Sequence, residues 1–203
     1  MAFAIGICLA AAALAISGSD AKSLVLALRL TARWSFLLFW VAYAGAALGV
    51  LFGRVFEPLA RRGREFGLAY AAAQLVHAAV VVWLYAISPR PPLSVGLATF
   101  FLVGIFWTYL LAIFSFGGLS QALGAKGWWT LRIVGMNYIL FAFAFDFVPV
   151  SIHGPAHYGA WRLFQYAPFA AMTIAAPLLL VAAAVQRRLG IRYAHLRLEP
   201  VVN

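Results

Sequence analysis

The chain has 203 residues, of which 66% are hydrophobic and only 10% charged, and its formal net charge is +10. Soluble domains carry about a quarter charged residues, so this composition excludes an ordinary soluble domain, and it also excludes a disordered chain. A single cysteine excludes a disulfide scaffold. Nucleic-acid binding needs a water-exposed basic face, whereas here the residues between the charges are almost all apolar. The composition predicts an integral membrane protein that contacts the lipid bilayer and no nucleic acid.

Six apolar segments have about the length that a membrane-spanning helix needs, which is about 20 residues. The sequence therefore predicts an all-α fold, an integral membrane bundle of six transmembrane helices in a single domain, 1–203. The first segment could be a signal peptide, but it has no basic residues. We expect it to stay uncleaved; cleavage would leave five spans. The predicted spans are 1–17, 34–53, 67–87, 95–116, 129–150 and 166–185.

The segments between the spans are short. The apolar stretch 24–32 is expected to lie along the outer membrane interface. Three prolines in 88–92 predict a tight turn that is not helical. Glycines 117, 118 and 124 predict a break in the chain before the fifth span.

Two later segments also lie outside the predicted spans. His153 and His157 flank Gly154 and Pro155, so this segment is expected to be a loop rather than a metal-binding helix. The mixed basic and apolar tail, 187–203, is expected to lie on anionic lipid at the cytoplasmic surface.

The basic residues are divided unequally between the two sides of the predicted bundle. With both termini inside, the cytoplasmic side has about twice as many as the outer side, which is the distribution of the positive-inside rule. We therefore predict a multi-pass protein of the inner (plasma) membrane with both termini cytoplasmic. The predicted cytoplasmic set is Arg54, Arg61, Arg62, Arg64, Lys126, Arg132, Arg187, Arg188, Arg192 and Arg197, and the outer set is Lys22, Arg29, Arg33, Arg90 and Arg162.

Polar residues within the third span are the first candidates for a functional site, because such residues are unfavourable in lipid. Gln74 and His77 are three residues apart and share one helix face. His77 lies about 15 Å into the span at helical rise, near mid-membrane. Two interpretations stay open. The imidazole can bond to a polar group on a neighbouring helix, or it can be an axial ligand of haem.

The fifth span contains a second set of polar residues. Arg132 is expected in its first turn, from where its side chain can extend to the inner surface. Asn137 lies at about the depth of Gln74, so a hydrogen bond between these two amides would explain both. Asp146, near the outer end, is expected to pair with Arg162 or with a loop histidine.

Two longer motifs carry a family resemblance. RRGREFGLAY at 61–70 runs into QLVH at 74–77, and WWTLRIVGMNY occupies 128–138; ARWS at 32–35 opens the second span. Together, over about 30–150, they resemble bacterial members of the ferric reductase-like transmembrane family. That family includes the haem-carrying membrane subunit of the periplasmic methionine sulfoxide reductase system and the eukaryotic NADPH oxidases.

The resemblance implies a six-helix core over about 30–186 that holds haem b through histidines on the third and fifth spans. His77 matches one such histidine and is the expected metal ligand, whereas Gln74 and Arg132 stand where relatives have histidines. The fifth span has no histidine, so Met136 is the candidate for a second ligand in a His/Met pair. The residues expected to line the haem site are His77, Gln74, Met136, Arg132 and Asn137.

The resemblance also implies a function. The protein would be a transmembrane electron-transfer subunit that works with a redox partner protein or a quinone. It would be at most an oxidoreductase membrane subunit, since no segment is long enough for a flavin or nicotinamide domain. The alternative is a haem-free relative that acts as a membrane anchor, an assembly partner or a small-molecule binder.

Overall fold

A computed structural model describes residues 1–18, 20–116, 118–158 and 160–197, and over these residues the chain is helical, without strands. Five helices are long and apolar enough to cross a membrane, namely α2, α4, α5, α7 and α8, and α1 is a shorter apolar helix. The predicted all-α membrane bundle is therefore confirmed. The elements are α1 (Ala2–Ser17), α2 (Ala21–Phe52), the short 3-10 helix η1 (Gly53–Val55), α3 (Glu57–Arg61), α4 (Gly63–Ile87), α5 (Val95–Ser115), α6 (Leu119–Ala122), α7 (Gly124–Tyr158) and α8 (Trp161–Arg197).

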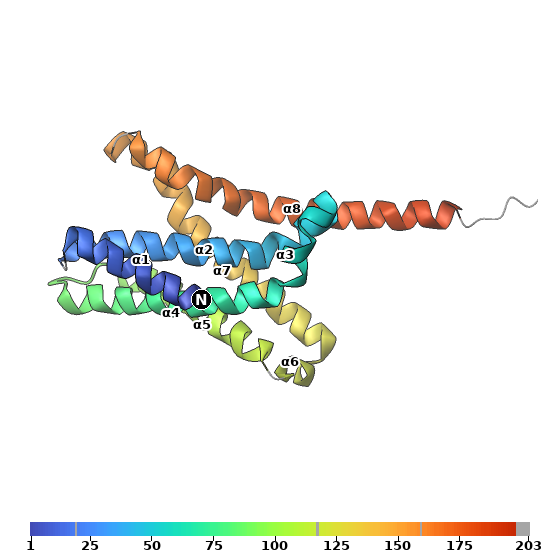
Figure 1. Cartoon of the computed structure of the whole chain (residues 1–203), viewed down its shortest axis with the longest axis horizontal. Helices are drawn as coiled ribbons and strands as arrows, with labels where there is room; N and C mark the ends of the chain where they lie inside the picture. The colour runs from blue at the N-terminus through green and yellow to red at the C-terminus, as the bar shows by residue number, and fades with distance from the viewer. Residues whose placement is uncertain (19, 117, 159, 198–203) are drawn as a thin grey trace, which may run out of the picture.

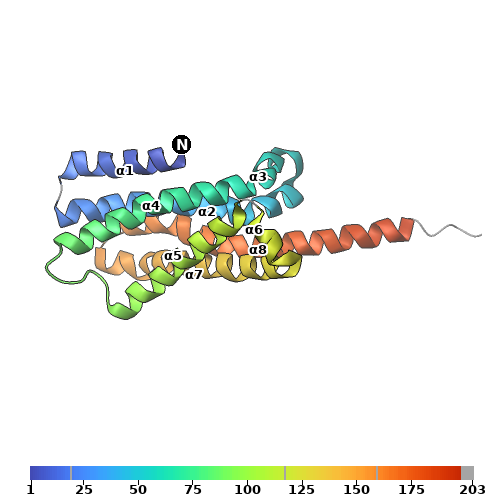
Figure 2. The same ribbon diagram turned by 90° about the horizontal axis from the view of Figure 1, so that it is seen from below.

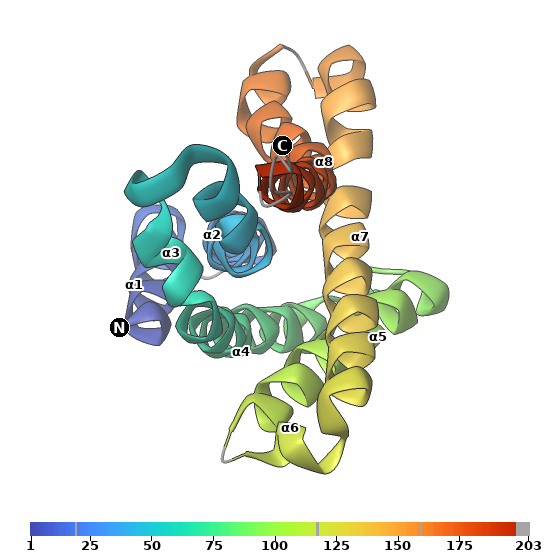
Figure 3. The same ribbon diagram turned by 90° about the vertical axis from the view of Figure 1, so that its right-hand side faces the viewer.

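Helix α2 lies at the centre of the bundle. It packs against α1 and α4 on one side and against α8 on the other, while α7 packs against α8 and α5 (Figures 1 and 3). The end that carries η1, α3 and α6 is called here the basic end, because Arg54, Arg61, Arg62, Arg64 and Lys126 lie on or beside these elements. The other end, called the opposite end, holds the α1–α2, α4–α5 and α7–α8 connections (Figure 2).

Aromatic side chains fill the space between α2, α7 and α8. The Phe36 ring packs edge-on against Phe143 and Phe147, with centroid distances of 5.0 and 5.1 Å. Phe169 of α8 lies 5.3 Å from Phe147. The two edge-to-face pairs that Phe36 makes are an arrangement that the ring quadrupoles favour. This cluster joins three helices that are far apart in the sequence.

The expectation that 24–32 lies along the membrane interface is wrong. This stretch is the first part of α2, which begins after Asp20, whose side chain caps the helix by accepting from the Ser23 backbone N–H. Leu24 and Ala27 have no exposed surface and pack with residues of α1 and α4. An interfacial helix would leave one face in water, whereas here neighbouring helices cover the stretch.

The predicted breaks before the fourth and fifth spans are found. Residues 88–94 form no helix, as the prolines predict. Gly118 precedes α6 with φ 80°, and Gly124 starts α7 with φ 65°. Both values lie in the left-handed region, which glycine adopts without steric cost.

The predicted loop around Gly154 and Pro155 is wrong, because α7 continues as a helix to Tyr158. A proline removes one backbone hydrogen bond, but an apolar helix retains the others and neighbouring groups can compensate. Helix α8 likewise runs through Pro168 and Pro177. At 37 residues it is about 55 Å long, so it extends past the bundle at the basic end (Figure 1). Of the predicted tail, residues 198–203 lie outside the described residues.

Candidate functional site

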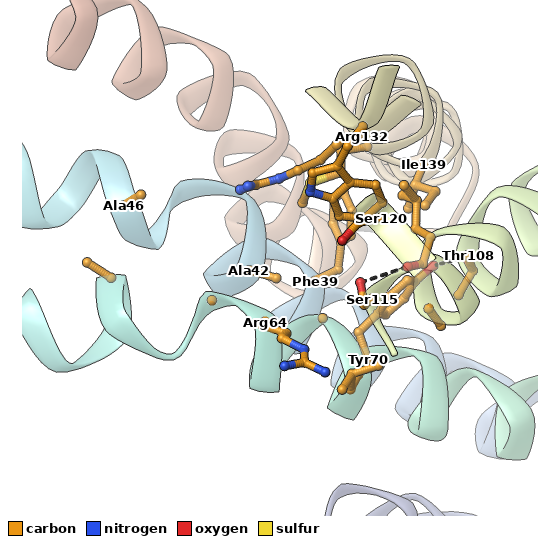
Figure 4. A pocket seen from close by; sticks show the side chains of 18 of the residues that line it. Phe39, Ala42, Ala46, Arg64, Tyr70, Thr108, Ser115, Ser120, Arg132 and Ile139 are labelled. Atoms are coloured by element: carbon orange, nitrogen blue, oxygen red, sulfur yellow. Dashed lines mark hydrogen bonds between the residues drawn. The ribbon is translucent and has the colours of Figure 1, made fainter. Parts of the chain in front are cut away.

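A pocket of about 520 Å³ lies at the basic end between α2, α4, α5 and α7 (Figure 4). This volume is within the range of small-molecule sites, about 300–1,000 Å³. Small residues on α2 and α4 leave the space open. A Cβ added at Gly67, for example, would have no neighbouring atom within 4 Å. The lining residues used below are Phe39, Arg61, Arg64, Tyr70, Thr108, Arg132, Met136 and Ile139.

Three arginines make one part of the pocket strongly cationic. Arg61 forms an ion pair with Glu57 at 2.6 Å. Arg64 on α4 and Arg132 on α7 are exposed side chains that line the pocket from different helices (Figure 4), and neither has a hydrogen-bond or ion-pair partner among the described residues. None of the residues described as lining the pocket is a carboxylate. Two such guanidinium groups can bind an anion through charge-assisted hydrogen bonds.

More of the pocket lining is apolar than polar, and its hydroxyl groups are those of Tyr70, Thr108, Ser115 and Ser120. Phe39, Met136 and Ile139 line the pocket, together with Tyr70 and Thr108. The Tyr70 and Thr108 hydroxyl oxygens are 3.0 Å apart, and Thr108 donates to the Gly104 carbonyl at 2.9 Å. The Thr108 proton is used in that bond, so Tyr70 is the donor of the pair. The pocket therefore combines a cationic part with an apolar part.

The structure brings two of the predicted site residues into this pocket. Arg132 and Met136 line it. Arg132 was predicted to lie in the first turn of its helix. That prediction is wrong, because α7 begins at Gly124, more than two turns earlier. Sequence analysis missed Arg64, Tyr70 and Thr108. The only signal for them was the arginine run just before the third span.

The hydrogen bond predicted between Gln74 and Asn137 is not formed. Asn137 accepts from the Tyr43 hydroxyl of α2 at 2.9 Å and donates to the Ile133 carbonyl at 2.8 Å. The Gln74 Oε1 atom is buried and has no hydrogen-bond partner among the described residues. Asn137 bonds to Tyr43, whereas Gln74 follows Tyr70, which is level with Phe39, and lies nearer the opposite end; the expected match in depth is therefore wrong.

His77 lies against α2 rather than in the pocket. Its Nδ1 is 3.0 Å from Thr31 Oγ1, and Thr31 donates to the Ala27 carbonyl at 2.9 Å. The imidazole and the Thr31 hydroxyl thus share one hydrogen bond across the α2–α4 interface. This arrangement is the imidazole bonded to a polar group on a neighbouring helix, the first of the two interpretations.

The residues do not fit a haem held jointly by His77 and Met136. His77 is flanked on α4 by Val76 and Val80, which pack with α1 and α2, whereas Met136 lies on the pocket. Within the described residues no group of three or more histidine, cysteine, aspartate or glutamate side chains could hold a metal ion. Haem ligation by His77 alone stays a prediction.

Asp146 does not form the predicted ion pair with Arg162 in the part of the chain that is described. Asp146 lies near Arg33 and Arg29 of α2, and within the described residues it forms no ion pair with either arginine or with His153. The side chain of His157 lies outside the described residues, so pairing with that histidine stays a prediction.

Comparison with family models, with curated proteins and with solved structures found no match to this chain. The resemblance to the ferric reductase-like family therefore stays a prediction.

Proposed function

We propose that this membrane protein binds an anionic amphiphile in the pocket at its basic end. The headgroup lies between Arg64 and Arg132, and an apolar chain extends along Phe39, Met136 and Ile139. One observation carries the proposal: two guanidinium groups without partners among the described residues line one pocket, more of whose lining is apolar than polar.

The charge of the site favours a phosphate monoester over an uncharged molecule. Phosphate oxygens accept from a guanidinium group in the paired geometry that arginine favours, and both Arg64 and Arg132 line the pocket. A neutral quinone would fill the apolar part but would leave both cations without a counter-charge. Electron transfer with haem b, a quinone or a redox partner stays a prediction from the family resemblance.

The basic end also supports an orientation. Arg54, Arg61, Arg62 and Arg64 lie on or beside η1 and α3, and Lys126 lies just after α6. Cytoplasmic ends of membrane proteins carry an excess of such residues. The proposed orientation places this end, the pocket and the end of α8 on the cytoplasmic side of the inner membrane, whereas α1 begins level with Trp34, midway along α2.

Binding of dodecyl phosphate, measured by calorimetric titration in an uncharged detergent, tests the proposal. Arg64→Ala or Arg132→Ala is expected to weaken binding roughly 10- to 100-fold, because a hydrogen bond to a charged group contributes about 1.5–3 kcal/mol. Arg90→Ala is the matched control, since Arg90 lies in the α4–α5 connection at the opposite end. It should bind like the wild type.

Two further probes measure separately how much the headgroup and the apolar chain of the ligand contribute to binding. Inorganic phosphate supplies the headgroup alone and is expected to bind more weakly than dodecyl phosphate. Dodecyl maltoside supplies the chain with an uncharged headgroup and should not displace dodecyl phosphate at equal concentration. Equal affinities of wild type, Arg64→Ala and Arg132→Ala for dodecyl phosphate would refute the proposed site.

A further inference from the structure

Two contacts fix the register between α2 and α4. Thr31 of α2 meets His77 of α4 at 3.0 Å, and Phe39 meets Tyr70 with ring centroids 5.3 Å apart. The helices are antiparallel, because residues further along α2 meet residues earlier in α4. Ser35 lies about one turn from both Thr31 and Phe39.

Gln74 lies on α4 between Tyr70 and His77, at the level of Ser35. Ser35 has no exposed surface, and its Oγ makes no hydrogen bond within the described residues. The Gln74 Oε1 is buried and is also without a partner there. Buried polar atoms in native proteins are nearly always bonded to protein or to ordered water. Two such atoms at one level of one interface indicate a shared partner.

We propose that Ser35 and Gln74 hold a buried water molecule between α2 and α4. The water accepts from the Ser35 hydroxyl and donates to Gln74 Oε1, which satisfies both side chains. Its second proton is left for another acceptor at this level of the interface. This site is independent of the ligand proposed for the pocket.

The position of the water gives it a role. On one side lies Tyr70, which lines the pocket at the basic end, and on the other lies His77. Beyond His77 towards the opposite end, α2 presents Ala27 and Leu24, neither of which has any exposed surface. The proposed water therefore lies about one turn from the imidazole on one side and from the Phe39–Tyr70 ring contact on the other, and it hydrates the interface beside His77.

Radiolytic hydroxyl labelling of the purified full-length protein tests the site, because X-ray activation of a bound water oxidises the side chains beside it. Modification of each residue is read by mass spectrometry. His77 is half-buried, so part of its wild-type labelling comes from its exposed surface, and Phe36, which is fully buried among aromatic rings, gives the background level. Wild-type His77 labelled no more than Phe36 would overturn the proposal and favour a direct bond between Ser35 and Gln74.

The double variant Ser35→Ala/Gln74→Leu is expected to lower His77 labelling severalfold relative to the wild type, to the share that its exposed surface contributes. The matched control is Ser151→Ala, because the Ser151 hydroxyl already donates to the Phe147 carbonyl at 2.8 Å. Its His77 labelling should equal the wild type. Unchanged labelling in the double variant would show that water reaches His77 elsewhere and would overturn the site.

Discussion

Two glycines at the interface of α5 and α7 differ sharply in the space around them. A Cβ added at Gly135 of α7 would lie 2.8 Å from Trp107 Cε3 and 2.9 Å from Leu111 Cδ1. A Cβ added at Gly104 of α5 would lie 3.8 Å from Tyr138 Cε1, which is ordinary van der Waals contact. Alanine should therefore be tolerated at position 104 and should force the helices to adjust at position 135.

The expected difference can be worked out from two terms. Replacing glycine by alanine within a helix stabilises it by about 1 kcal/mol, and this gain applies to both variants. Overpacking costs about 1–3 kcal/mol and applies only to Gly135→Ala. The difference between the variants therefore isolates the overpacking term, and it corresponds to a separation of about 2–12 °C in melting temperature for a chain of this size.

Thermal unfolding in one mild detergent measures both variants against the wild type. Gly104→Ala should melt at or above the wild-type temperature, and Gly135→Ala should melt below Gly104→Ala. Equal melting temperatures for the two variants would refute the close α5–α7 contact at Gly135. Circular dichroism of the folded variants checks that both retain the helical bundle.

Three further predictions concern polar groups and orientation. Tyr43→Phe removes the hydrogen bond to Asn137 and should lower the free energy of unfolding by about 0.6 kcal/mol, the average for such bonds in membranes; an unchanged value would show that this bond adds nothing. The family resemblance predicts a Soret band in protein purified from haem-sufficient cells and its loss in His77→Ala, and a wild type without the band contradicts it. A reporter fused after Asn203 should read cytoplasmic, whereas a periplasmic signal would reverse the proposed orientation.

The spans could be predicted from the sequence because a bilayer imposes a minimum apolar length on every crossing helix. That rule does not fix where a helix ends. Leu24 belongs to α2 because α1 and α4 cover it, and α7 continues past Pro155. Neither fact depends on local apolar content. Both depend on neighbours that pack from distant parts of the chain.

The candidate site was less predictable than the spans, since four helices build it. Arg132 and Met136 were singled out in one motif, but their partner across the pocket, Arg64, stood in another. The His77 contact with Thr31 joins residues 46 positions apart and requires the α2–α4 register. Sequence spacing defines which residues share a helix face, and only the packing defines what that face meets.

Polar groups inside a membrane protein must find partners within the protein, because lipid offers none. Most of those discussed here do. Asn137 bonds to Tyr43, Thr108 to the Gly104 carbonyl and His77 to Thr31. Three side chains keep a buried polar atom that has no hydrogen-bond partner within the described residues, namely Arg33, Ser35 and Gln74.

Arg33 differs from the other two, because its guanidinium lies over the Tyr166 ring at 5.1 Å and is stabilised there by a cation–π contact. Ser35 and Gln74 have no such contact, and they lie at one level between α2 and α4. Among the described residues, buried polar atoms without a partner or a ring contact are thus concentrated in the α2–α4 interface beside His77, and the exposed arginines lie at the pocket. These are the places where substitutions should change binding and hydration more than they change the fold.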